Sequence, residues 1–98
     1  MSHPVLIVDS EHGMRSALTN ALSSGGYAVE SVSDGSQALD RLRRNPFSLV
    51  ITDMQLPEIS GIEVLTEVKR TSPHVPVIMT TADGNIQSAV EADRKSVV

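Results

Sequence analysis

Two aspartates, Asp9 and Asp53, stand where short apolar runs of the sequence end, and Thr81 follows a third such run. Glu11 lies close behind Asp9. Carboxylates brought close together repel one another unless a cation lies between them. Oxygen ligands with no His or Cys nearby suit a hard ion such as Mg²⁺, and a carboxylate beside Mg²⁺ can attack phosphorus to form an acyl phosphate. These residues predict magnesium-assisted phosphoryl chemistry, provided that the fold brings them together.

The apolar runs have the length and β-branching of buried parallel strands. They cover residues 5–8, 49–51 and 76–80, and a more polar run at 27–32 indicates a strand at a sheet edge. Helical patterns fill the intervals, and a last one begins at Ile86. The order β-α-β-α-β-α-β-α predicts an α/β fold, with a parallel sheet, right-handed crossovers and helices on both faces.

This topology predicts that Asp9, Asp53 and Thr81 converge, because the carboxyl ends of parallel strands lie at the same edge of a sheet. The alternative is that each acid only caps a turn or a helix, which would be favoured for a single isolated aspartate. The matched positions at several strand ends favour a site.

Two helices carry clear start signals. Asp34 can cap one, and Ser60-Gly61-Ile62-Glu63 has the form of a capping box that opens another. The third helix is predicted to face inward with Ile62, Leu65 and Val68. The face predicted for the first helix consists of Met14, Ala17, Leu18, Ala21 and Leu22.

The composition is that of one small globular domain. The chain has 98 residues, of which 40% are hydrophobic and 20% charged, and it contains no cysteine. Its net charge of −4 argues against a nucleic-acid surface. No signal peptide is recognised, and no apolar stretch approaches the roughly 20 residues of a membrane helix. The predicted location is the cytosol, without membrane contact.

The sequence resembles the CheY-like receiver domain of bacterial two-component response regulators. The resemblance rests on Val5-Leu6-Ile7-Val8-Asp9, on Asp53-Met54-Gln55-Leu56-Pro57 with Ser60-Gly61, and on Pro76-Val77-Ile78-Met79-Thr80-Thr81-Ala82. It implies a flavodoxin-like, doubly wound sheet of order 2-1-3-4-5. It further implies that Asp53 accepts a phosphoryl group from a sensor histidine kinase. Mg²⁺ would be bound by Asp9, Asp53 and the backbone carbonyl of Gln55, and Thr81 would be the switch hydroxyl.

Two features depart from the family pattern. Ser10 stands where the family usually has a second acid, so either Glu11 or Ser10 would complete the metal site, or Mg²⁺ binding would weaken. The chain also stops at Val98, before a fifth strand and helix, which predicts a receiver domain over residues 1–98 that is incomplete at its C-terminus. The strand around residues 77–79 would then lie at an open edge, which predicts self-association.

The predicted function is a phosphoryl-accepting signalling domain that is not itself an enzyme and that switches an output domain or a downstream protein. A first alternative is a receiver-like module that binds partners without phosphorylation because Ser10 has weakened the metal site. A second, less favoured alternative is an aspartyl-nucleophile phosphohydrolase. Those enzymes resemble the pattern Asp-x-Asp, and Gln55 stands at the place of the second acid.

Overall fold

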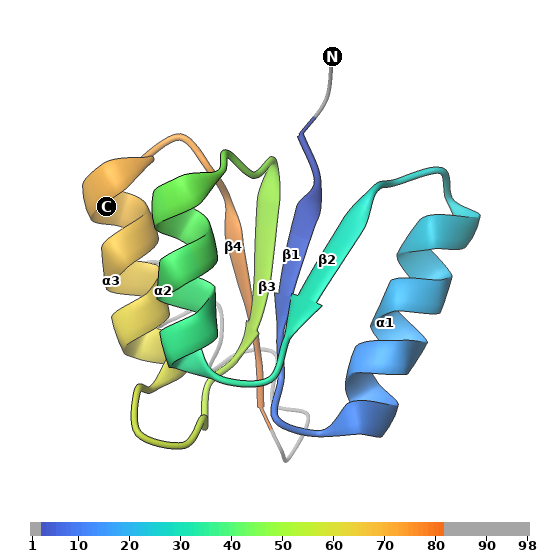
Figure 1. Cartoon of the computed structure of the whole chain (residues 1–98), viewed down its shortest axis with the longest axis horizontal. Coiled ribbons are helices and arrows are strands. Elements are labelled where there is room, and N and C mark those ends of the chain that lie inside the picture. Colours follow the sequence, from blue (N-terminus) through green and yellow to red (C-terminus); the bar gives the residue numbers. More distant parts are fainter. Residues whose placement is uncertain (1–2, 82–98) are drawn as a thin grey trace.

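A four-stranded parallel sheet runs through the computed structural model, which describes residues 3–81 (Figure 1). The elements are β1 (Val5–Val8), α1 (His12–Ser24), β2 (Val29–Val32), α2 (Gly35–Arg44), β3 (Leu49–Asp53), α3 (Gly61–Thr71) and β4 (Val77–Thr80). The strand order is β2-β1-β3-β4 with every pair parallel, which confirms the predicted doubly wound arrangement. The helix predicted to begin at Ile86 lies outside the described residues.

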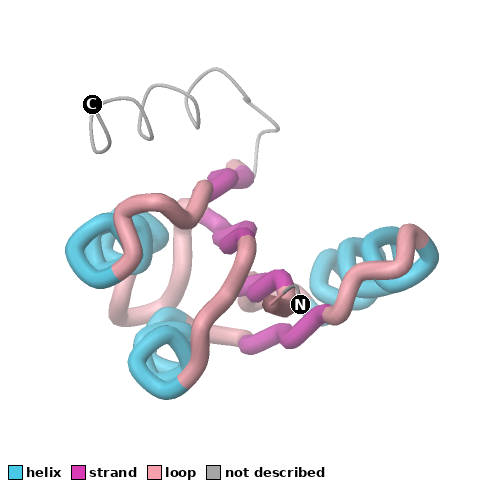
Figure 2. Tube along the Cα trace, turned by 90° about the horizontal axis from the view of Figure 1, so that it is seen from above, coloured by secondary structure: helices cyan, strands magenta, loops and turns pink. Residues whose placement is uncertain are grey.

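Helices cover both faces of the sheet, as predicted. α2 and α3 pack side by side on one face, and of the described helices α1 covers the other (Figure 2). The larger core cluster lies on the α2–α3 side and includes Leu6, Val50 and Leu65. The smaller cluster faces α1 and contains Val5, Ile7 and Ile51. Every residue of β1 is buried because this strand is central and is covered on both faces.

The predicted caps of α2 and α3 are present. The Asp34 carboxylate accepts a hydrogen bond from the backbone N–H of Gln37 at 2.8 Å. The Ser60 hydroxyl accepts one from the N–H of Glu63 at 3.3 Å. Each satisfies a backbone donor that the first turn of a helix leaves without an intrahelical partner. These two caps therefore set where the helices start after β2 and β3.

Three predictions of burial were wrong. Ile62 is 39% exposed, and Val64 is buried in its place on the inner side of α3. β4 was expected to be wholly buried, but Ile78 is 51% exposed. On the first helix Leu18 and Leu22 pack against the smaller cluster, whereas the rest of the predicted face is exposed: Met14, Ala17 and Ala21. Ile78 pairs with Ile51 and so lies on the face that α1 covers, and that face is incompletely covered because α1 is the one described helix on it.

No helix among the described residues combines the length and the apolar character needed to cross a membrane.

Candidate functional site

The strand register brings the predicted residues to one edge of the sheet. Val8 pairs with Thr52 on β3, and Asp53 pairs with Thr80 on β4. Asp9 follows β1 directly and so lies beside Asp53, which ends the neighbouring strand. Thr81 follows β4 on the other side of Asp53 and is half-buried. We call this edge, formed by Asp9, Asp53 and Thr81, the acidic edge.

Asp9 is held firmly by backbone groups. Its side chain is buried, and its Oδ1 accepts a hydrogen bond from the N–H of Glu11 at 2.9 Å. Its own N–H donates to the carbonyl of Val32 at 3.2 Å. Its carbonyl accepts a hydrogen bond from Nη1 of Arg15 at 2.8 Å. These contacts tie the loop after β1 to both β2 and α1.

Asp53 is half-buried, and its surroundings disfavour its charged form. Burial is the main cause that raises the pKa of the Asp53 carboxyl, and the charges of Asp9 and Glu11 act in the same direction. The backbone N–H of Gln55, which donates to Oδ1 at 3.1 Å, opposes them, as does the N–H of Met54. Burial and the neighbouring acids thus together favour the neutral form of this carboxyl.

The alternative that these acids cap a turn or a helix holds for the turn and not for the helix. Glu11 is the N-cap residue of α1 but makes no side-chain capping bond, and α3 is capped by Ser60. Asp9 and Asp53 instead each accept the N–H two residues further on, which closes the turn after each strand. The turn bond places both carboxylates at the strand ends and leaves each with further acceptor capacity.

The donor set of the acidic edge fits a hard cation. Two carboxylates of adjacent strands supply oxygen, and Mg²⁺ binds through one or two carboxylates and several waters. Within residues 3–81, no group of three or more His, Cys, Asp or Glu side chains comes together as a metal site, and a role for Glu11 as a further ligand stays a prediction. Ser10 is exposed. The backbone N–H of Gln55 donates a hydrogen bond to Asp53, and the carbonyl of Gln55 stays the predicted metal ligand.

The sequence matches the model of the response regulator receiver domain over residues 5–97. The chain belongs to this family. It is 38% identical to the response regulator protein FleR of Pseudomonas aeruginosa, an alignment that covers 97% of this chain and 20% of FleR. The chain thus spans about a fifth of the length of this curated relative.

Solved structures of receivers have the same fold. NtrX from Brucella abortus is similar over 100% of this chain and 22% of its own, with a TM-score of 0.86 and 31% identity. The response regulator TrrA of Thermotoga maritima, in complex with Mg²⁺-BeF, is similar over 94% of this chain and 81% of its own, with a TM-score of 0.79 and 29% identity. These findings confirm the predicted family and fold, and with them a place in two-component signalling.

Gly61, which the sequence placed in a capping box and in the motif of the family resemblance, packs against the acidic edge. It is buried, and its N–H donates to the carbonyl of Met54 at 2.9 Å. A Cβ at this position would collide with the carbonyl oxygen of Asp53 and would lie 2.8 Å from the Cα of Met54. Only a glycine allows the start of α3 to pack directly against the backbone of Asp53 and Met54. The sequence signals for this position were its place immediately after the N-cap Ser60 and its part in the family motif.

Proposed function

We propose that this receiver accepts a phosphoryl group on Asp53 from a sensor histidine kinase in the cytosol and passes the signal to an output domain or a downstream protein. The observation that carries the proposal is the register that puts Asp53 between Asp9 and Thr81. Burial and neighbouring acids raise the pKa of Asp53, and this supports a site at which a bound cation would stabilise the ionised carboxylate.

The chemistry would be a phosphoryl transfer between side chains. A carboxylate oxygen of Asp53 forms a bond to the phosphorus of a phosphohistidine, the P–N bond breaks, and the imidazole leaves. Mg²⁺, when bound by Asp9, Asp53 and the Gln55 carbonyl, would offset the negative charge of the group in transfer. The turn bonds of Asp9 and Asp53 fix the positions of the two carboxylates. The Mg²⁺-BeF complex of the relative TrrA supports this ion.

The switch would act through the end of β4. A phosphorylated Asp53 carries more negative charge and additional acceptor oxygens. Thr81 directly follows β4, the strand next to Asp53, and can supply a hydroxyl donor to them. Movement of Thr81 would shift the balance between two arrangements of the segment that follows β4, and a partner would bind the surface so altered.

Intact-mass measurement tests the assignment. The chain is incubated with Mg²⁺ and a small acyl-phosphate donor, and the mass gain of the wild type is compared with that of Asp53→Asn. We expect the wild type to gain one phosphoryl group and Asp53→Asn to gain none. Asp40→Asn is the matched control, because Asp40 lies on the surface in an ion pair with Arg44. An equal gain in wild type and Asp53→Asn would refute Asp53 as the acceptor.

Two observations favour the phosphorylation-independent alternative. Ser10 is exposed, and no third acidic side chain is gathered with Asp9 and Asp53 in the described part of the chain. A titration with Mg²⁺ separates the two functions, because saturable binding that depends on Asp53 is expected only for the phosphoryl-accepting receiver. A phosphohydrolase is less favoured, because the amide of Gln55 cannot serve as the general acid.

A further inference from the structure

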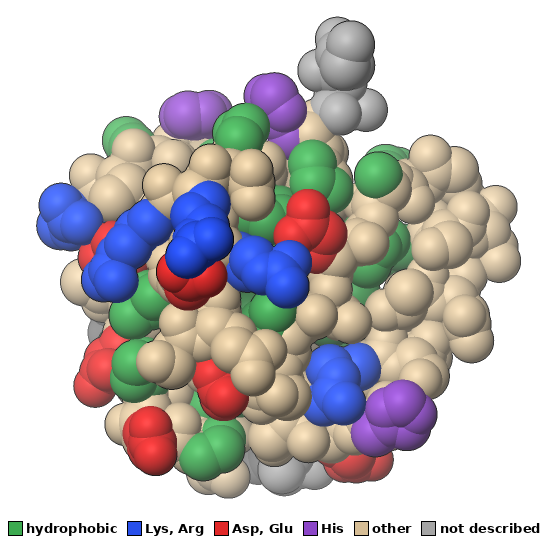
Figure 3. Space-filling model, in the orientation of Figure 1, with side chains coloured by type: hydrophobic (Ala, Val, Ile, Leu, Met, Phe, Trp, Pro, Cys, Tyr) green, Lys and Arg blue, Asp and Glu red, His purple; other side chains and the backbone are tan. Residues whose placement is uncertain are grey.

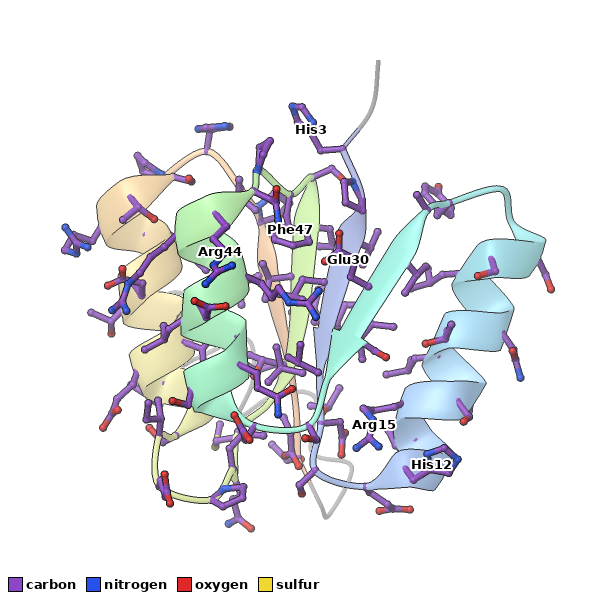
Figure 4. All side chains as sticks on the ribbon, viewed as in Figure 1. His3, His12, Arg15, Glu30, Arg44 and Phe47 are labelled. Carbon is purple, nitrogen blue, oxygen red and sulfur yellow. The ribbon has the colours of Figure 1, made fainter. Side chains whose placement is uncertain are left out.

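A polar pocket of about 440 Å³ lies between the N-terminal half of α1, the end of β2 and the start of α2. Its volume falls in the range of about 300–1,000 Å³ that is typical of small-molecule sites. The residues that line it include His12, Arg15, Ser16, Ser31, Ser33 and Gln37. His12 and Arg15 lie together on α1 at this end of the molecule (Figure 4). Neither Asp9 nor Asp53 lines the pocket, although the pocket adjoins the acidic edge through the bond of Arg15 to the Asp9 carbonyl.

The lining has the character of an anion site with additional hydrogen-bonding groups. All lining residues except Val32 are polar, and none is acidic, although the chain carries a net charge of −4. Hydroxyl and amide side chains surround one guanidinium and one imidazole. An apolar ligand would find little complementary surface here, whereas a charged and hydroxylated one would find donors and acceptors on several sides.

Arg15 differs from the other arginines that the structure describes. Each of those forms an ion pair: Arg41 with Glu30, Arg44 with Asp40, and both Arg43 and Arg70 with Glu67. Figure 3 shows these basic side chains over α2 and α3 with carboxylates between them. No described carboxylate pairs with Arg15, whose Nη1 donates to the carbonyl of Asp9 at 2.8 Å and whose Nη2 lies 3.4 Å from Nδ1 of His12. The guanidinium is thus held in place while its charge is left uncompensated.

Two acids close to the pocket in sequence, Asp34 and Glu30, have other partners. Asp34 accepts hydrogen bonds from the backbone and side chain of Gln37, and Glu30 pairs with Arg41 at 2.8 Å. Because Asp34 already caps α2, the start of this helix does not supply the pocket with its anion-binding character. That character comes from the side chains of Arg15 and His12.

We propose that this pocket binds a small phosphate-bearing molecule with hydroxyl groups, with its phosphate on Arg15 and His12 and its hydroxyls on the serine and amide side chains of the opposite wall. A guanidinium forms charge-assisted hydrogen bonds to phosphate oxygens, and the bond to the Asp9 carbonyl orients it in advance. The pocket is larger than a phosphate ion needs, which leaves room for the hydroxylated part of the ligand.

A titration with inorganic phosphate, followed by NMR of the ¹⁵N-labelled chain, tests the site. The Asp53→Asn background without Mg²⁺ keeps phosphate chemistry at the acidic edge out of the measurement. We expect saturable shifts centred on His12, Arg15 and Gln37, and we expect Arg15→Gln to raise the Kd about tenfold through loss of a charged donor. Arg44→Gln is the matched control and should leave the Kd unchanged, because Arg44 lies on α2 away from the pocket (Figure 4).

Two further arms keep the proposal open to refutation. Arg15→Lys retains the charge, and its phosphate affinity should fall between those of the parent and Arg15→Gln even if the glutamine variant folds poorly. Glycerol 3-phosphate should bind more tightly than inorganic phosphate, because its hydroxyls reach Ser31 and Gln37. Shifts that do not saturate, shifts spread over α2 and α3, or equal affinity in the parent and both Arg15 variants would overturn the site. Equal affinity for the two probes would overturn the role of the hydroxylated wall.

Discussion

Asp53 is a residue whose charge works against the stability of the fold. Its pKa is raised mainly by burial and further by Asp9 and Glu11, so the folded chain holds this proton more tightly than the unfolded chain does. The free energy of unfolding therefore falls as the pH rises through and just above the ordinary carboxyl value of 3.8. In the proposed function the ionised form of Asp53 is nevertheless required, because an ionised carboxylate is the form that can accept a phosphoryl group.

Replacing Asp53 by asparagine should consequently stabilise the receiver at neutral pH. The expected gain in the free energy of unfolding is less than about 1 kcal/mol, because Asp53 is partly exposed and solvent screens its charge. The gain should vanish when the pH falls below the ordinary carboxyl pKa, where Asp53 is neutral in the parent as well. Urea denaturation of both proteins across this pH range measures it. A gain of the same size at every pH would show that the charge of Asp53 is not its cause.

Ser10 gives a second prediction at the scale of a residue. Ser10→Asp should tighten Mg²⁺ binding about tenfold, because a charged oxygen is added beside Asp9 at an edge that already carries uncompensated negative charge. Isothermal titration calorimetry with Mg²⁺ measures the change. Ser10→Asn is the control that adds an oxygen without a charge. Unchanged affinity in Ser10→Asp would mean that Glu11 already serves the ion or that residue 10 points elsewhere.

At the scale of elements, the contact between α3 and β3 holds the acidic edge in shape. The N–H of Gly61 donates to the carbonyl of Met54, and the N–H of Met54 donates to the carbonyl of Thr80, each at 2.9 Å. Three successive elements, β3, α3 and β4, are thereby joined at the turn that follows Asp53. This turn also contains Glu58 with a φ of 64°, a left-handed conformation that is unfavourable for a residue with a side chain.

Gly61→Ala should disturb this contact. We expect a loss of about 1–3 kcal/mol in the free energy of unfolding, since the added methyl group meets backbone atoms that cannot rotate away. The rate of Asp53 phosphorylation should fall as well, because the displaced backbone carries the acceptor. Thermal or urea denaturation and the intact-mass assay measure the two effects.

Gly13→Ala is the matched control for this helix position. A Cβ at Gly13 would meet only the side-chain Oε1 of Glu11, at an ordinary distance of 3.7 Å. The substitution should therefore show the helix propensity of alanine alone, a gain of up to about 1 kcal/mol. If both alanine variants gained stability, the close approach of Gly61 to Asp53 would not constrain the fold.

At the scale of the whole molecule, the two faces of the sheet are covered unequally. The face under α2 and α3 holds the larger core, whereas α1 is alone on the other face among the described elements (Figure 2). β4 ends the described sheet, and Ile78 on it is 51% exposed. An edge strand with an exposed apolar residue is a template for pairing with another chain. Self-association of this chain stays a prediction that follows from this asymmetry.

Light scattering over a dilution series checks it. The apparent mass should rise with concentration in the wild type, and Ile78→Lys should shift the equilibrium toward the monomer, because a charge at an edge strand opposes pairing. Ile62→Lys is the control, since Ile62 is an exposed apolar residue of α3, away from the edge. A wild type that stays monomeric at every concentration, or equal effects of the two lysines, would contradict pairing through β4.

Local sequence pattern was sufficient to predict the described strands and helices and the place of the acidic edge. Short β-branched runs form β1 and β3, and hydrogen bonds within a few residues cap α2 and α3, so local pattern was sufficient for them. The convergence of Asp9 and Asp53 also followed from the sequence, because parallel strands joined by helices must end at the same edge.

Which side chains are covered and which charges are paired depends on how the elements pack against one another. Val64 rather than Ile62 is buried because the angle at which α3 packs on the sheet selects the face, and a periodic pattern tolerates a shift of that face. The close approach of Gly61 to the Asp53 backbone and the uncompensated charge of Arg15 depend on contacts between separate elements. Such contacts leave no signature in local sequence, because each partner is set by packing over the whole fold.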